Sequence, residues 1–188
     1  LHLCDQHLSH MKAENIDNKD NLLLEVLLAA QYEGSSLVKK YKEYKQQNND
    51  SQICTVLARS FADIGDIIRG KDLFRGYNEK DRNEKKQLQD SLKNIFGHIY
   101  EKLIKNGRNG EAAEARYGSD GPEFFKLRED WWNANRAKVW KAIRCSAPTD
   151  ADYFIKTACS GGFKTNKKCQ CVDGDPPTFF DYVPQFLR

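Results

Sequence analysis

The segment ADIGDIIRG at residues 62–70 places two carboxylates, Asp63 and Asp66, three residues apart in a stretch with helical rhythm. Side chains at that spacing lie on one side of a helix. Two carboxylates in such a position can act as general acid and general base when a concave site drives their pKa values apart. Acid–base catalysis is therefore the first chemistry to weigh.

Two arginines close to these aspartates favour a different interpretation. Arg59 lies four residues before Asp63, and Arg69 lies three residues after Asp66. At these spacings the groups form surface ion pairs that contribute a few tenths of a kcal/mol each. We therefore predict that both aspartates are solvated and salt-bridged on a scaffold helix, and that neither is catalytic.

Other signatures of catalysis or of a metal centre are missing from the sequence. The histidines His2, His7, His10 and His98 form no HExxH pattern, and no GxSxG, GxxxxGK or GxGxxG occurs. Metal binding by the three histidines near the start is the less favoured reading. We predict no catalytic residue, no cofactor and no metal ligand.

Six cysteines are present, and four of them fall in the last quarter of the chain. They are Cys4, Cys54, Cys145, Cys159, Cys169 and Cys171. An even number with a late cluster is typical of disulfides in an oxidising compartment, and all six are predicted to form them. Six cysteines allow 15 pairings, so the connectivity stays open. A zinc site would rest on CQC at 169–171, but zinc ligands are usually spaced Cys-x2–4-Cys and no second pair follows.

Lysines beside aromatic residues form two groups. KKYKEYK at 39–45 and FKTNKK at 163–168 combine positive charge with aromatic rings. Sulfated polysaccharides and nucleic acids both bind such surfaces through charge and counterion release. A solvated lysine face is the default interpretation, and partner contact is the functional one. The predicted polyanion- or receptor-binding residues are Lys39, Lys40, Lys42, Lys45, Lys164, Lys167 and Lys168.

Composition predicts one ordered domain with a strongly polar surface. The chain has 188 residues, of which 39% are hydrophobic and 30% charged, with a net charge of +3. The 30 Lys and Arg residues against 27 Asp and Glu are too even for a dedicated nucleic-acid binder. No segment reaches the roughly 18–20 apolar residues needed to cross a bilayer. The chain lacks an initiator methionine, and we expect it to be a piece of a longer protein.

Helical periodicity predicts the elements that must position these residues. The predicted helices span about 21–47, 53–70, 78–107 and 120–145. A bend or break is expected at Gly34, and Asp120 or Gly121 is expected to cap the last helix, with Pro122 in its first turn. The tryptophans of that helix are the expected centre of the core.

The pattern dissolves after Cys145, where only a short helix near 150–158 is expected. Glycine, lysine, cysteine and proline then punctuate the sequence. A stretch this long without secondary structure needs a covalent staple in a compact domain, and the cysteine cluster supplies one. The predicted fold is all-α: an irregular helical bundle with a long disulfide-stapled loop near the C-terminus.

Three long motifs, LARSFADIGDIIRG, WWNANRAKVWKAIRC and FFDYVPQFLR, occur in that order along the chain. Together with LHLC at 1–4 they resemble the Duffy-binding-like domains of the erythrocyte membrane protein one family of Plasmodium falciparum, and the alpha class most of all. The resemblance spans almost the whole chain. It places the ADIGDIIRG motif on a scaffold helix, in agreement with the packing interpretation.

The resemblance implies a disulfide-bonded, extracellular, all-α domain of three subdomains. The chain would then be a single partial domain over 1–188, with the end of the first subdomain at about 1–50, the second at about 51–175 and the start of the third at about 176–188. Family members are adhesins on the surface of infected red cells, anchored in the membrane by another part of the protein. Alpha-class domains are associated with rosetting through heparan-sulfate-like glycans, blood-group sugars or complement receptor one.

The resemblance thus implies a host glycan or protein receptor as partner, with host antibodies also expected, and implies neither a nucleic-acid partner nor a membrane segment in this chain. Two other classes stay open. A basic helical nucleic-acid-binding protein would keep its cysteines reduced, and an enzyme of unrecognised type would need a buried polar pocket with shifted pKa values. A glycan site that extends over subdomains outside this chain would leave the chain alone without binding.

Overall fold

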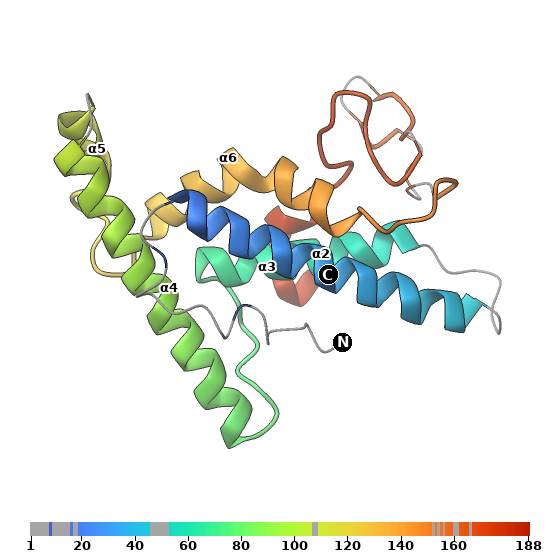
Figure 1. The fold of residues 1–188 in the computed structure, drawn as a ribbon, viewed down its shortest axis with the longest axis horizontal. Coiled ribbons are helices and arrows are strands. Elements are labelled where there is room, and N and C mark those ends of the chain that lie inside the picture. The colour runs from blue at the N-terminus through green and yellow to red at the C-terminus, as the bar shows by residue number, and fades with distance from the viewer. Residues whose placement is uncertain are drawn as a thin grey trace. The chain divides into compact units, whose positions relative to one another are not determined.

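The regular structure of the chain is helical. The computed structural model describes residues 8, 16, 19–45, 53–106, 109–151, 153, 155, 157–159, 162–165 and 167–188. In this part of the chain the helices are α2 (Lys19–Lys45), α3 (Ile53–Arg69), α4 (Glu79–Asn106), α5 (Gly110–Tyr117) and α6 (Phe125–Ile143), followed by the 3-10 helices η3 (Phe180–Tyr182) and η4 (Gln185–Leu187) (Figure 1). The predicted all-α class is confirmed for the described residues.

Helix α5 is the element that periodicity did not predict. Its sequence, GEAAEARY, consists largely of good helix formers, but none of its residues is buried. A helix is recognised in a sequence by apolar residues that recur every three or four positions, and a short helix without a buried face lacks this repeat. Propensity, and not hydrophobic patterning, was the available signal.

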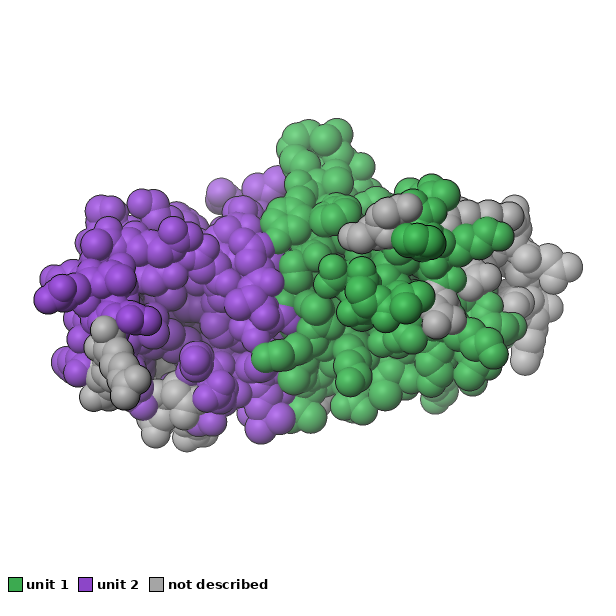
Figure 2. Space-filling model, turned by 90° about the horizontal axis from the view of Figure 1, so that it is seen from above, with its two compact units in different colours: residues 1–4, 27–65, 136–188 green, residues 5–26, 66–135 purple. Residues whose placement is uncertain are grey.

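The chain divides into two compact units (Figure 2). Unit 1 comprises residues 1–4, 27–65 and 136–188, and unit 2 comprises residues 5–26 and 66–135. Helices α2, α3 and α6 each contribute residues to both units. The three-part division predicted with boundaries near residues 50 and 175 stays a prediction.

The core of unit 1 is centred on Trp140, whose side chain is fully buried. Phe61 of α3 packs against it edge-on, with ring centres 5.3 Å apart. The indole Nε1 donates a hydrogen bond to the Cys169 carbonyl at 2.9 Å. The tryptophan therefore joins α6 to the C-terminal segment, as expected for a core residue with one polar atom to satisfy.

Unit 2 has its own core, in which the α6 residues Trp131 and Trp132 are buried. Trp131 meets Phe96 of α4 edge-on, with ring centres 6.1 Å apart. Helical periodicity predicts a buried stripe on α4 at Leu88, Leu92, Ile95, Ile99 and Leu103; the first four are buried, whereas Leu103 is half-buried. Phe125, predicted on an apolar face of α6, is 49% exposed because it is the first residue of the helix and has no preceding turn to cover it.

The start of α6 lies later than the predicted position near residue 120. The Asp120 carboxylate accepts hydrogen bonds from the backbone N–H groups of Lys126 at 2.9 Å and Leu127 at 3.0 Å. Asp120 therefore caps the helix, as predicted, by satisfying two N–H groups that lack a partner within the helix. Pro122, predicted in the first helical turn, lies instead in the turn that precedes Phe125.

Two disulfides pin the long C-terminal segment of unit 1. Cys54 at the start of α3 is bonded to Cys169, and Cys159 is bonded to Cys171. Cys145 differs from the prediction, since its thiol is free and exposed. The other four cysteines of the described chain are bonded to each other, so none of them is available to Cys145. Cys4 lies outside the described residues.

The segment after Cys145 is held by specific contacts and not by secondary structure. Its described residues between 150 and 158 are not helical, so the short helix predicted there is wrong. The Ala151 carbonyl accepts a hydrogen bond from the Cys169 N–H, and the buried Tyr153 hydroxyl donates to Thr178. The Cys169 N–H therefore satisfies a carbonyl that a helix would have satisfied locally, and Thr178 gives the buried Tyr153 hydroxyl a partner.

Helix α2 runs through Gly34 without a break, so the break expected there is wrong. A methyl group on Gly34 would overlap the backbone carbonyl oxygen of Ile143 in α6. The glycine thus permits the close approach of the two helices.

Gly34→Ala is expected to lower the free energy of unfolding by about 2 kcal/mol, because the two backbones must move apart. Urea unfolding followed by circular dichroism measures it. Gly97→Ala in α4 is the matched control, since its new methyl would meet Phe124 at an ordinary 3.5 Å. That control should be neutral or stabilising by up to about 1 kcal/mol. Equal effects at the two glycines would contradict the close-approach explanation.

Candidate anion-binding site

The two aspartates that opened the sequence analysis both form ion pairs. Asp66 accepts a hydrogen bond from Arg69 at 3.0 Å, and Asp63 accepts one from Arg188 at 3.0 Å. The predicted pairing of Asp66 with Arg69 is confirmed, but its predicted surface position is wrong. Arg69 is 1% exposed, because its guanidinium lies over the ring of Trp132. The pairing of Asp63 with Arg59 stays a prediction.

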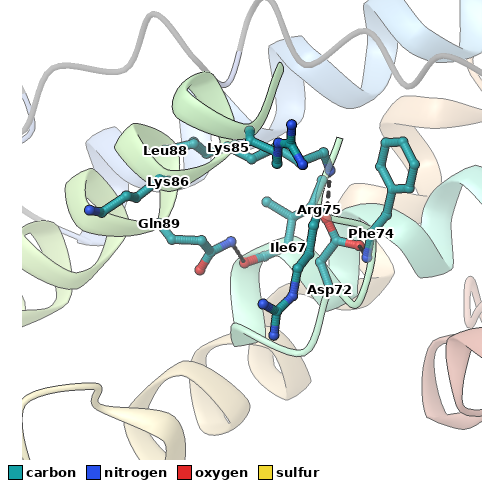
Figure 3. A pocket seen from close by; sticks show the side chains of 9 residues that line it. Ile67, Asp72, Phe74, Arg75, Lys85, Lys86, Leu88 and Gln89 are labelled. Carbon is teal, nitrogen blue, oxygen red and sulfur yellow. Dashed lines mark hydrogen bonds and ion pairs between the residues drawn. The ribbon is translucent and has the colours of Figure 1, made fainter. Parts of the chain in front are cut away.

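A cavity of about 270 Å³ lies in unit 2, lined by the end of α3, the segment after it and the first half of α4 (Figure 3). Its lining residues are Ile67, Asp72, Phe74, Arg75, Arg82, Lys85, Lys86, Leu88 and Gln89. Four of them are cationic and one is acidic, so the cavity carries an excess of three positive charges. Figure 3 shows the α4 side chains on one side and those of residues 67–75 on the other.

The floor of the cavity is apolar and fixed. Ile67 and Leu88 are buried. Gln89 donates a hydrogen bond to the Ile67 carbonyl at 3.1 Å and accepts one from Arg128 at 2.9 Å. Both polar atoms of the Gln89 amide thus have protein partners.

Arg128 of α6 holds the end of α3 beneath this floor. Its guanidinium donates to the carbonyls of Ile68 at 2.6 Å and Ile67 at 3.1 Å. A cation suits the C-terminal end of a helix, where carbonyls lack helical partners. Burial lowers the pKa of Arg128 to about 10, although the carboxylate of Glu123 opposes the shift. The group is therefore still charged at neutral pH.

One wall of the cavity is an ion pair. Lys85 lies 2.7 Å from the Asp72 carboxylate, and its Nζ atom is 4.8 Å from the centre of the Phe74 ring. The other oxygen of Asp72 accepts a hydrogen bond from the Phe74 N–H at 3.1 Å. These bonds fix the turn that carries Phe74, and the Asp72 carboxylate balances the positive charge of Lys85.

The rim of the cavity contains three cations that, unlike Lys85, are exposed to solvent. Arg75, Arg82 and Lys86 are exposed. Within the described part of the chain, their side chains form no ion pair and no hydrogen bond. An anion can therefore bind these three groups without breaking an existing ion pair, which is the arrangement that anion recognition favours.

The lysines predicted from the sequence belong to unit 1 and do not line this cavity. Lys39, Lys40 and Lys42 are exposed on α2, and the Lys45 side chain lies outside the described residues. In the C-terminal segment Lys164 and Lys167 are exposed, while Lys168 donates a hydrogen bond to the Cys145 carbonyl at 3.4 Å. Their role in binding stays a prediction.

Sequence reasoning missed the cavity because its charged α4 residues lie in NEKDRNEKKQ, where acids and bases alternate. Such a run reads as a solvated helix face. The positions 82, 85, 86 and 89 nevertheless share one side of a helix, and this spacing was the available signal.

Within the described residues, no group of three or more His, Cys, Asp or Glu side chains is placed to hold a metal ion. None of the helices described is both long and apolar enough to cross a membrane.

Comparison with known proteins identifies relatives over the whole chain. The family model of the Duffy binding domain matches residues 1–188. The NTS-DBL1(alpha-1) domain of the membrane protein 1 (PfEMP1) of the Plasmodium falciparum varO strain is 43% identical, and the two structures superpose with a TM-score of 0.79 over 99% of this chain and 40% of that chain. The ICAM-1-binding DBLbeta domain of the PfEMP1 IT4var13 is 32% identical, with a TM-score of 0.68 over 100% of this chain and 39% of that chain.

This chain therefore spans about two fifths of the length of both solved relatives. Among curated proteins none matches. The resemblance drawn from the three motifs is confirmed, and identity is higher with the alpha-class domain than with the beta-class one. By its sequence over all 188 residues and by its helical fold, the chain belongs to the Duffy binding domain family.

Proposed function

We propose that this chain is an adhesion module of a variant surface antigen and that it binds a sulfated glycan of the host-cell surface. The observation that supports the glycan is the group of three exposed, unpaired cations around one cavity. The relatives support adhesion, because they include domains of PfEMP1 that bind ICAM-1. The module acts outside the parasite, on the surface of the infected red cell.

A sulfated glycan suits this surface better than a nucleic acid. The positive charge is local to the cavity, whereas the whole chain is nearly balanced. Two disulfides are also typical of an oxidising, extracellular setting. A protein receptor is the second candidate, since ICAM-1-binding relatives are 32% identical to this chain.

Neutralising the rim in the variant Arg75→Gln/Arg82→Gln/Lys86→Gln is expected to weaken heparin binding about 30-fold. Each exposed ion pair contributes up to about 1 kcal/mol, and three are lost. The dependence of log affinity on log salt should flatten by about one unit for each lost contact. Isothermal titration of the oxidised chain at several salt concentrations measures both quantities.

The matched control is Lys164→Gln/Lys167→Gln/Lys168→Gln, which removes the same charge from unit 1. We expect it to change heparin affinity less than threefold. A large loss in this control with none in the rim variant would place the site at the predicted loop lysines. An unmodified chain that does not bind heparin would leave the protein receptor as the candidate.

A further inference from the structure

We infer that the cavity selects a single sulfated sugar residue and does not attract polyanions by charge alone. This inference rests on the proposed function and concerns the same site. It follows from the size of the cavity, from its apolar surface and from the placement of its acidic residue.

The size of the cavity fits one sugar and not a chain. Its volume of about 270 Å³ lies just below the roughly 300–1,000 Å³ range of small-molecule sites. A flat basic surface would contact many sulfates along a polymer, but a cavity encloses one unit of it. The binding energy then depends on how that unit fits.

The cavity has an apolar part and a cationic part, and these complement the apolar face and the anionic edge of a sulfated pyranose. Phe74, which is 40% exposed, supplies the accessible apolar area, and the buried side chains of Ile67 and Leu88 form the floor beneath it. A pyranose has an apolar C–H face that packs on such a surface. A sulfo group on the edge of the same ring can bind a cation of the rim.

The position of Asp72 adds a second restriction. It is the acid among the lining residues, and it is fixed by Lys85 and by the Phe74 N–H. A sugar hydroxyl can donate a hydrogen bond to this carboxylate, whereas an ionised sulfo group has no proton to donate. The cavity therefore favours a residue with one anionic edge and one hydroxyl edge.

The test compares sugar and non-sugar polyanions on the oxidised chain and its Phe74→Leu variant. The probes are a heparin-derived disaccharide, heparin, and polyvinyl sulfonate, which carries sulfonates without a pyranose. Titration calorimetry at constant ionic strength gives each affinity. We expect Phe74→Leu to weaken the disaccharide and heparin about tenfold and to change polyvinyl sulfonate less than twofold, because leucine has no flat face. Phe74→Trp retains one and should bind both sugars within about threefold of the unmodified chain.

Equal losses for the sugars and for polyvinyl sulfonate, or no loss for either, would overturn the inference while heparin binding itself stands. The same holds if inorganic sulfate at matched ionic strength displaces the disaccharide from the unmodified chain. Absence of heparin binding to the unmodified chain would instead overturn the proposed function. Circular dichroism and thermal unfolding of both variants show whether a loss reflects unfolding. If the leucine variant is unstable, the competition between inorganic sulfate and the disaccharide on the unmodified chain decides the question.

Discussion

Replacing Cys54 and Cys169 together by alanine is expected to lower the free energy of unfolding by about 5 kcal/mol. The bond joins residues 115 apart, and the entropy that a cross-link removes from the unfolded chain grows with the length of the closed loop. Both cysteines are fully buried, so alanine avoids adding an unpaired hydroxyl that serine would bring. Urea unfolding measures the loss.

The second disulfide provides the comparison. Cys159 and Cys171 are only 12 residues apart, and their replacement by alanine is expected to cost about 3 kcal/mol. Cys145 should be changed to alanine in every chain compared, because its exposed thiol can exchange with disulfides. If the short loop proved the more stabilising of the two, chain entropy would not explain the result.

Arg128→Met is expected to lower the free energy of unfolding by about 3 kcal/mol and to weaken heparin binding as well. Methionine fills much of the volume but removes the donor of the Ile68 carbonyl and of the Gln89 amide oxygen, whereas the Ile67 carbonyl keeps its hydrogen bond from Gln89. Each buried acceptor left unsatisfied costs about 1–3 kcal/mol. Because Ile67 and Gln89 line the cavity, its floor should loosen at the same time.

The matched control for this change is Arg116→Met. Arg116 is exposed and its hydrogen bonds go to Asp130, whose pKa these bonds lower. An exposed pair of this kind contributes less than about 1 kcal/mol. Chemical unfolding and heparin titration of both variants separate the two roles. A similar small effect for both would mean that Arg128 does not organise the cavity.

The spacing of apolar residues predicted the helices, but it did not predict which of their polar side chains are buried. The steps from Leu57 to Phe61 to Ile64 follow one face of α3, and all three side chains are buried. The same reasoning put Asp66 and Arg69 at the surface, because spacing along a helix says nothing about what packs over it. The ring of Trp132, about 60 residues away, buries that pair.

The cavity escaped prediction for a related reason. Its walls come from residues 67–75 and 82–89, and a turn of irregular backbone sets how those stretches face each other. Gly76, with a φ of 94°, is one residue of that turn whose conformation favours glycine. Periodicity describes each stretch but not the angle between them, so the charges could be found from the sequence and the cavity that they line could not.

The Cys54–Cys169 bond also has a mechanical consequence for an adhesion module. The cavity residues 67–89 lie inside the covalent loop that this bond closes. A tensile load applied by a ligand at the cavity divides between two backbone routes, one back to Cys54 and one onward to Cys169, which rejoin at the disulfide. Each route carries only part of the load, so the closed loop lowers the force that acts on each helix within it.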